Sequence, residues 1–482
     1  MTSEHLGYQV GRLAGSRVLV LNWRDIRHPQ AGGAEQYMHE IASRWVAAGA
    51  RVTWFAARPA GMTRREKLDG IDVVRAGGPL SLYPLVALRL LRWRKRVDFV
   101  VDCQNGIPFF SPLFVPRSIP VVQVVHHVHQ DQFATRFGTL LAAVGRFLEG
   151  RASRWIYGRR PIAAVSPSTR QELRRRLGFQ GPIFIVPNGA VVARSERAPR
   201  DPQPRVVVVS RLVPHKRLDL LLEQLPPVID QVPGIRVDIL GDGPELSRLR
   251  RLAADLGLAA TVTFHGYQPN TVRDQLLAGA WVTASTSAAE GWGCSVIEAA
   301  GWGVPCVALN VPGIRDCVLD GRTGWLAADG NSFGSTLVAA LRELADEESM
   351  HRVAAACQAW AACFTWDRSA DLLAGVLRAK SARAGRVRIA RSDIAAVARL
   401  SRDCSDPRVL AEYLRPTDQI AIDQNRINLL LPGCDEIDAA AVLRRLGRMA
   451  IDVRLADRHD LLAGPDGMPI GLSTRATLAT PS

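Results

Sequence analysis

The sequence predicts an α/β protein with two doubly wound parallel sheets that face a cleft, followed by a small α+β module. Short β-branched runs alternate with amphipathic helical stretches, a pattern typical of parallel α/β architecture. The alternation stops at a polar segment rich in Arg and Pro, Ala193–Pro204, and then starts again, which indicates a linker. We therefore expect three domains, over residues 1–200, 201–384 and 385–482.

The first domain is expected to begin with a buried strand, Arg17–Trp23, because Val and Leu dominate this run. A loop containing Pro and Gly, Asp25–Gly33, leads into a helix over Ala34–Ala47. A basic helix is expected at Leu82–Arg96. Further strands are expected at Arg51–Phe55, Ile71–Val74, Asp98–Val101, Pro120–Val125 and Pro161–Val165.

The second domain repeats this order. Because ligands of doubly wound sheets bind at the carboxyl ends of the strands, functional residues are expected in the loops that follow them. The expected elements are a strand at Arg205–Ser210, a helix from Arg217, and strands at Arg236–Leu240, Thr261–Phe264, Trp281–Ala284 and Pro305–Leu309. In the C-terminal remainder we expect helices at Arg391–Leu400, Pro407–Leu414 and Asp435–Arg448 and a hairpin of Gln419–Asp423 with Ile427–Leu431.

The net charge is unevenly distributed. The 482 residues carry 61 Lys+Arg and 46 Asp+Glu, a formal net charge of +15. Residues 1–200 hold 30 basic and 13 acidic residues, whereas residues 201–482 hold 31 and 33. Two basic clusters, each interleaved with apolar side chains, lie on expected helices: Arg89, Arg92, Arg94, Lys95 and Arg96, and Arg146, Arg151, Arg154, Arg159 and Arg160. Such helices suit an anionic membrane surface, although solvated arginine faces are equally common.

Several classes of protein are excluded by composition. No apolar run reaches the ~18–20 residues that span a bilayer, and no secretory signal is apparent. The eight cysteines show no metal-ligand spacing, so neither a metal site nor a disulfide framework is expected. No nucleic-acid recognition motif accompanies the basic charge. We expect a cytoplasmic protein, peripheral at the inner face of the cell membrane through its basic clusters.

Three loops have residue types suited to a phosphorylated ligand. Gly32 and Gly33 precede a helix, where backbone N–H groups favour a phosphate, although a glycine pair also makes ordinary tight turns. Arg211 and Lys216 follow the first strand of the second domain, where two cations can clamp a diphosphate. The turn Gly241–Pro244 serves either a ligand or only the turn itself.

The most specific signal is a pair of acids, Glu290 and Glu298, with Gly291 and Gly293 between them. Glu290 falls in a glycine-rich loop after an expected strand, and Glu298 lies about one turn inside the next helix. One carboxylate can therefore face a sugar while the other reaches a ribose.

With these residues the chain resembles the retaining, nucleotide-sugar-dependent glycosyltransferases of family four, which have the GT-B fold. The likeness runs from about Arg17 to Lys380. Glu290 and Glu298 match the family's E-x7-E motif, and Arg211 and Lys216 match its diphosphate clamp. Further matches are the loop with Gly32, Gly33 and Glu35, the strand Pro120–His126, the segment Val186–Gly189, and Phe364–Asp367 before a final helix, about 367–380, that crosses back to the N-terminal domain.

The resemblance implies roles for these residues. Arg211 and Lys216 would stabilise the departing nucleoside diphosphate in place of a metal ion. Glu298 would hold the ribose, and Glu290 would contact the donor sugar near the transferred carbon. The remaining site residues would be His126, which hydrogen-bonds the donor sugar or acceptor, and the donor-binding glycines Gly32, Gly33, Gly291 and Gly293. The leaving phosphate would deprotonate the acceptor on the same face, which retains the anomeric configuration.

The chain departs from the family pattern at two of the matched segments, and beyond them it carries a C-terminal extension of another kind. Asn188 and Gly189 precede Ala190 instead of an acid, which leaves the geometry of the linker open. His127 and His129 follow His126, and a structural role is expected for His129. The segment Leu414–Gly433 faintly resembles the hairpin of diguanylate cyclase (GGDEF) domains. Its signature positions are occupied by Asp423, Gln424, Asn425 and Arg426, so a degenerate regulatory or packing module is expected.

The resemblance implies hexosyl transfer in the synthesis of a cell-envelope glycan or glycolipid. The donor would be GDP-mannose or a UDP-hexose, acting as co-substrate with no separate cofactor, and the acceptor a glycan or a lipid-linked molecule. Two alternatives remain open at this point: a nucleotide-sugar 2-epimerase and a non-catalytic nucleotide-sugar sensor. The sequence leaves the donor base, sugar and acceptor undetermined.

Overall fold

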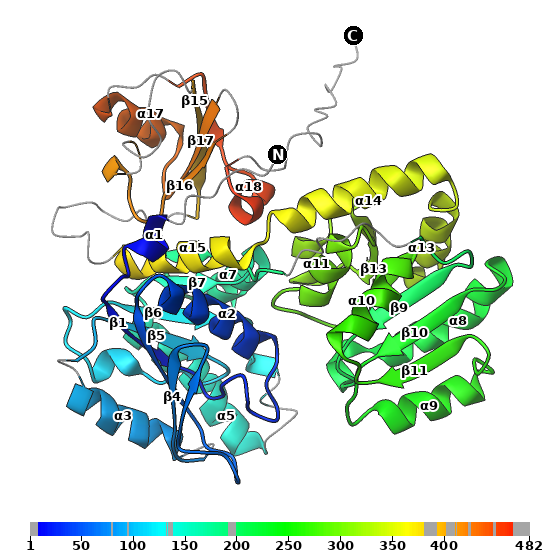
Figure 1. Ribbon diagram of the computed structural model, residues 1–482, viewed down its shortest axis with the longest axis horizontal. Helices are drawn as coiled ribbons and strands as arrows, with labels where there is room; N and C mark the ends of the chain where they lie inside the picture. Colours follow the sequence, from blue (N-terminus) through cyan, green and yellow to red (C-terminus); the bar gives the residue numbers. More distant parts are fainter. Residues whose placement is uncertain are drawn as a thin grey trace. The chain divides into compact units, whose positions relative to one another are not determined.

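A computed structural model describes residues 8–78, 81–93, 96–131, 133, 138–190, 199–379, 393–401, 410, 412–422, 426–446 and 450–465. The chain forms two compact units (Figure 1). Unit 1 contains residues 1–189 and 366–467, and unit 2 contains residues 190–365. The domain limits expected at residues 200 and 384 remain predictions. In the part of the chain that is described, no helix is long and apolar enough to cross a membrane.

The N-terminal part of unit 1 is built on an eight-stranded sheet in the order β3-β4-β2-β1-β5-β6-β7-β8. Its pairings are parallel apart from the antiparallel pair β3–β4. The sequence did not predict the edge strands β3 and β8. The strands are β1 (Arg17–Leu21), β2 (Arg51–Ala56), β3 (Arg65–Leu68), β4 (Ile71–Arg75), β5 (Phe99–Gln104), β6 (Val121–Val125), β7 (Ile162–Ala164) and β8 (Ile183–Ile185).

Two helices of unit 1 come from parts of the chain that lie far apart in the sequence. α2 (Gly33–Ala47) follows β1, whereas α15 (Trp366–Arg378) follows the last residue of unit 2. They pack together, and the buried Trp45 donates its indole N–H to the carbonyl of Ala370 at 3.0 Å. The other helices are α1 (Tyr8–Gly11), α3 (Leu82–Trp93), η1 (Ser111–Leu113), α5 (Thr139–Phe147), the π-helix η2 (Leu148–Ala152), α6 (Ser153–Tyr157) and α7 (Pro167–Arg175).

Unit 2 has a six-stranded parallel sheet in the order β11-β10-β9-β12-β13-β14. The order reverses between β9 and β12, so the loops after these two strands emerge side by side. The strands are β9 (Arg205–Val209), β10 (Arg236–Leu240), β11 (Val262–Gly266), β12 (Val282–Ser285), β13 (Cys306–Leu309) and β14 (Gly324–Ala327). The helices are η3 (Pro214–Lys216), α8 (Leu218–Gln231), α9 (Leu246–Asp255), α10 (Asn270–Gly279), α11 (Cys294–Gly301), α12 (Ile314–Cys317), α13 (Gly330–Glu343) and α14 (Glu347–Ala362).

The C-terminal module, residues 393–465, belongs to unit 1 and has an antiparallel four-stranded sheet in the order β16-β17-β15-β18. α17 covers one face of the sheet and α18 lies on the other side (Figure 1). The bounds are β15 (Ala395–Ser401), β16 (Gln419–Ile422), β17 (Arg426–Pro432), α17 (Glu436–Arg445), β18 (Asp452–Leu455) and α18 (Arg458–Ala463).

The expected helix at Arg391–Leu400 is wrong, because residues 395–401 form the central strand β15. Ala396, Ala398 and Leu400 point into the core under α17, while Ala395 and Val397 pack on the opposite face. Alanine-rich composition favoured a helix, but residues 395–398 are all buried in a strand that pairs with β17 and β18 and is covered on both faces. The hairpin β16–β17 is confirmed. Positions 423–425 of the GGDEF-like signature lie outside the described residues.

A buried ion pair fixes the loop that follows β1. Arg75 and Asp25 are each 1% exposed, and the guanidinium makes two hydrogen bonds to the carboxylate, at 2.6 and 2.9 Å. A third guanidinium nitrogen donates to Glu66 at 2.8 Å. The loop is thus tied to β4, far away in sequence.

We predict that Arg75→Leu lowers the free energy of unfolding by about 3–5 kcal/mol, because it leaves the carboxylate of Asp25 buried without its partner. Urea unfolding followed by fluorescence measures the change. Arg51→Leu, at an exposed position on β2, should stay within about 0.5 kcal/mol of the parent. Equal effects of the two substitutions would contradict the assignment.

Candidate active site

The loops after β9 and β12 in unit 2 bring two of the predicted residues into contact. Lys216 closes the short helix η3, and its ammonium pairs with the carboxylate of Glu290. Ser287 donates its hydroxyl to the same carboxylate at 2.8 Å. Backbone contact also joins the loops, since the N–H of Ala288 donates to the carbonyl of His215 at 2.9 Å. Strand adjacency therefore places a cation and an acid from distant segments at one point.

Arg211 lies in the same loop as Lys216 but is exposed, with no ion pair to its guanidinium among the residues described. Its loop is braced by the turn after β10. Leu212 donates its N–H to the carbonyl of Asp242 at 2.9 Å, and a Cβ on Gly241 would lie 1.8 Å from the carbonyl oxygen of Ser210. Gly241, at φ 135°, is therefore required by this close packing of two backbones.

The loop after β13 also contacts the backbone of Glu290, and the sequence did not predict this contact. Gly313 has a φ of 81°, and a Cβ there would lie 2.1 Å from the carbonyl oxygen of Glu290. Glu290 donates its N–H to the carbonyl of Pro312 at 3.1 Å. A glycine after a strand is a weak signal on its own, so only the tertiary contact shows why this one is needed.

Glu298 lies on α11, separate from the Lys216–Glu290 pair, and faces Arg273 of α10 at 3.4 Å. Burial raises the pKa of Glu298, and the charge of Arg273 opposes that rise. Arg273 was not predicted from the sequence, where it is one arginine on a helix. Gly293 is the residue before α11, and its N–H donates to the sulfur of Cys317 at 3.1 Å. Gly291 lies between Glu290 and the buried Trp292.

In unit 1, the glycine pair sits at the start of α2, where Glu35 organises the surrounding loops. The N–H of Gly32 donates to the Glu35 carboxylate at 2.7 Å, and Gly33 is the first helical residue. The carboxylate is 1% exposed and also accepts from Arg24 at 3.0 Å and from Asn105 at 3.3 Å. Through these hydrogen bonds Glu35 joins the loops after β1 and β5 to the start of its own helix.

His126 follows β6 and packs edge-on against Tyr37 of α2, with 4.9 Å between ring centroids. Burial lowers the pKa of His126 to about 4. The imidazole is therefore neutral near pH 7, able to donate one hydrogen bond and accept another. His129 is held differently: its backbone N–H donates to the buried Glu149 at 2.7 Å, consistent with the structural role expected for it.

The predicted residues thus fall into separate groups. Gly32, Gly33 and His126 belong to unit 1, and the clamp and the acids belong to unit 2. Within unit 2, Lys216 and Glu290 touch, while Glu298 is paired with Arg273. Among the described residues no group of three or more His, Cys, Asp or Glu is arranged to hold a metal ion. The catalytic and binding roles of these residues remain predictions.

Two Rossmann-like α/β units, each built on a doubly wound sheet, make up the GT-B fold. Sucrose-phosphate synthase from Thermosynechococcus elongatus has a similar fold, with a TM-score of 0.64 at 18% identity, covering 77% of this chain and 100% of that chain. In sequence, residues 31–194 match the model named Glycosyltransferase Family 4, and residues 193–359 match that of the glycosyl transferases group 1.

Two relatives extend this match. The GDP-mannose-dependent alpha-(1-6)-phosphatidylinositol monomannoside mannosyltransferase of Mycobacterium tuberculosis is 31% identical over 406 residues, 79% of this chain and 94% of the relative. The D-inositol 3-phosphate glycosyltransferase of Nocardia farcinica is 32% identical over 241 residues, 46% of this chain and 52% of the relative. The chain therefore belongs to the group 1, family 4 glycosyltransferases.

We predict that acid destabilises the fold through His126. Its folded pKa of about 4 lies below the ordinary value of 6.5, so the unfolded chain binds the proton more readily. Its contribution to stability is complete above pH 6.5 and is lost as the pH falls toward 4. Urea unfolding at pH 7 and pH 5 should show a smaller acid loss in His126→Asn than in the parent, whereas the exposed control His351→Asn should match the parent. An imidazole of His126 that titrates above pH 6 by NMR would contradict this.

Proposed function

We propose that this glycosyltransferase moves a hexosyl unit from a nucleoside-diphosphate sugar to a phosphoinositol-containing, lipid-linked acceptor, with retention of configuration and without a metal ion. The names of both relatives support this class of acceptor, since one name includes phosphatidylinositol and the other includes inositol 3-phosphate. GDP-mannose is the first donor to test, because the mycobacterial relative is named for it. UDP-hexoses are the second.

The contact between Lys216 and Glu290 is the observation that carries the proposal. It brings a cation from the loop after β9 against the acid proposed to meet the donor sugar, with Arg211 in the same loop. A diphosphate bound by Arg211 would compete with Glu290 for Lys216 and free the carboxylate to face the sugar. Binding of the donor diphosphate and stabilisation of its developing negative charge would then depend on the same residues.

Retention follows from the proposed use of the leaving phosphate as the base. The acceptor oxygen bonds the anomeric carbon on the same face that the diphosphate leaves, and its proton passes to the departing diphosphate oxygen, while Arg211 and Lys216 hold the developing negative charge. The neutral His126 is proposed to orient the donor sugar or acceptor hydroxyl by hydrogen bonding. NMR of the anomeric proton of the product, with and without EDTA, tests both stereochemistry and metal independence. The epimerase and sensor alternatives are not favoured by relatives that are transferases.

We predict that Lys216→Ala lowers kcat about 10²–10³-fold while the protein stays folded, because one preorganised cation is lost from the developing diphosphate. Release of nucleoside diphosphate in the presence of acceptor measures the rate. Arg250→Ala, at an exposed position on α9, is the control and should keep the parent rate. A loss below tenfold would show that Lys216 is not part of the clamp.

An exposed apolar face on unit 1 supports action at a membrane surface. Large apolar side chains project to solvent from α5 and α6, and Arg146, Arg151 and Arg154 on α5, η2 and α6 are also exposed. This combination of apolar and cationic groups suits insertion at an anionic lipid surface. Its apolar members are Leu140, Leu141, Val144, Phe147 and Trp155, with exposures of 76%, 63%, 47%, 53% and 85%.

The structure also reduces the number of arginines in the two basic clusters that are available for the proposed membrane contact. Arg89 lies over the rings of Phe55 and Trp93, at 5.5 and 4.5 Å, and burial lowers its pKa. Burial lowers the pKa of Arg160 as well. Arg89 and Arg160 are therefore packed against protein. Arg94 and Lys95 lie outside the described residues. The proposed membrane contact is carried by α5 to α6, at the cytoplasmic face.

We predict that Leu141→Glu combined with Phe147→Glu abolishes binding to vesicles containing phosphatidylglycerol, because both positions then repel the anionic surface. Co-sedimentation at low salt measures binding. Tyr267→Glu, which replaces an 81% exposed aromatic residue of unit 2, should bind like the parent. Equal binding of the parent to neutral and anionic vesicles would contradict the proposal.

A further inference from the structure

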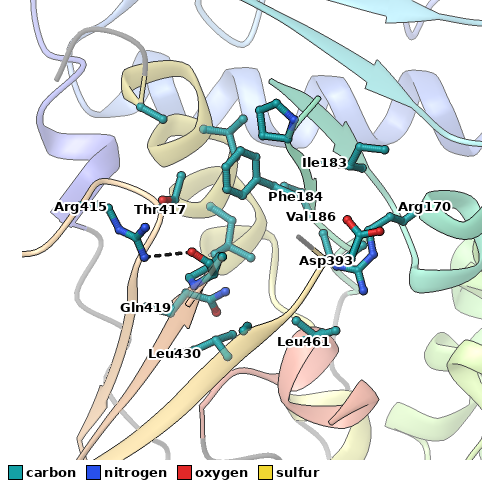
Figure 2. Close-up of a pocket in the computed structure, with 18 of the residues that line it drawn as sticks. Arg170, Ile183, Phe184, Val186, Asp393, Arg415, Thr417, Gln419, Leu430 and Leu461 are labelled. Carbon is teal, nitrogen blue, oxygen red and sulfur yellow. Dashed lines mark hydrogen bonds between the residues drawn. The ribbon is translucent and has the colours of Figure 1, made fainter. Parts of the chain in front are cut away.

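A crevice of about 120 Å³ lies in unit 1 where the C-terminal module meets β8, α7 and α15 (Figure 2). The module contributes one wall, and the transferase sheet and its helices contribute the others. All lining residues belong to unit 1, so the crevice is distinct from the proposed clamp on unit 2. Its volume is comparable to the ~150 Å³ cavity that accepts a benzene ring in another protein.

Arg170 of α7 gives the crevice a cationic end. Figure 2 shows Arg170 beside Asp393, with Arg415 and Thr417 on the opposite side. Asp393 is already engaged by Arg174, whose guanidinium meets it at 2.7 and 3.0 Å. For the Arg170 guanidinium, the structure records no hydrogen bond or ion pair within 4 Å among the described residues; burial lowers its pKa, and the negative charge of the nearby Asp393 opposes that shift. Arg170 therefore keeps donors for an anionic group.

The opposite end is neutral, and the walls between the ends are apolar. Arg415 is balanced by Asp418, 2.7 Å away, and donates to the carbonyl of Pro432 at 2.9 Å. The walls include Ile183, Leu372, Val376, Leu430 and Leu461. A fitting ligand thus has a compact hydrocarbon body and a single negative group.

Both chain connections between the two units continue from walls of the crevice. β8 runs through Val186 to Gly189, where unit 1 first ends, and α15 begins at Trp366, where the chain returns. The connections are in contact, since Ser369 donates its hydroxyl to the carbonyl of Pro187 at 2.7 Å. A Cβ on Gly189 would lie 2.4 Å from the backbone nitrogen of Trp366. A ligand in the crevice would therefore press on both segments.

We propose that this crevice is a binding site for a small apolar organic acid, held by Arg170, and that its occupancy is transmitted to the two connecting segments, residues 186–189 and 366–376. The C-terminal module is then a regulatory element, because it supplies the wall that makes the site.

Benzoate and its uncharged isostere benzamide test the binding site on the full chain. Isothermal titration and saturation-transfer NMR should show saturable benzoate binding at about millimolar affinity, with benzamide at least tenfold weaker. Arg170→Gln should remove the preference for benzoate. Arg175→Gln, on an exposed position of the same helix, should leave it unchanged. Leu430→Trp should block both compounds by filling the crevice.

Equal binding of benzoate and benzamide, unchanged binding by Arg170→Gln, or no saturable binding in the folded parent would each overturn the site. Hydrogen exchange tests the coupling independently of any transferase activity. Saturating benzoate should slow amide exchange in residues 186–189 and 366–376 in the parent but not in Arg170→Gln. Protection confined to the C-terminal module would overturn the coupling.

Discussion

The parallel arrangement of strands in the sheet of unit 2 is the constraint on which the proposed donor site depends. Parallel strands direct their carboxyl ends to one edge, and the order reverses between β9 and β12. Lys216 and Glu290, separated by 74 positions, therefore meet without any local sequence signal that pairs them. The glycines at 241 and 313 then let neighbouring loops approach the backbone of this edge.

In unit 1, buried carboxylates with their hydrogen-bonding partners hold the loops at the carboxyl ends of the strands. Asp25 is held by Arg75, and Glu35 gathers hydrogen bonds from Gly32, Arg24 and Asn105. Each carboxylate is costly to bury alone, so it is stable only when every partner is in place. These contacts tie the loops at the carboxyl ends of β1 and β5 to the start of α2, where the glycine pair lies.

The sequence pattern predicted much of the α/β architecture because Val-rich runs and amphipathic helices report burial directly. The sequence pattern failed where a residue takes its place from contacts with segments that lie far away in the sequence. β15 is built from alanines that favour a helix in isolation, and pairing with β17 and β18 on both sides overrides that preference. Arg273 and Gly313 escaped detection for the same reason, because each acquires its place only from a contact with Glu298 or Glu290.

By itself the sequence determined the class of fold and singled out the residues proposed as the clamp, Arg211 and Lys216, and as the two acids, because these depend on residue type and spacing along the chain. Tertiary structure decided which of them touch: Lys216 meets Glu290, whereas Glu298 meets Arg273. It also decided that Arg89 and Arg160 are packed, that His126 is held neutral by burial, and that the C-terminal module forms a crevice with α15. These depend on desolvation and on contacts across long sequence separations, which no local pattern encodes.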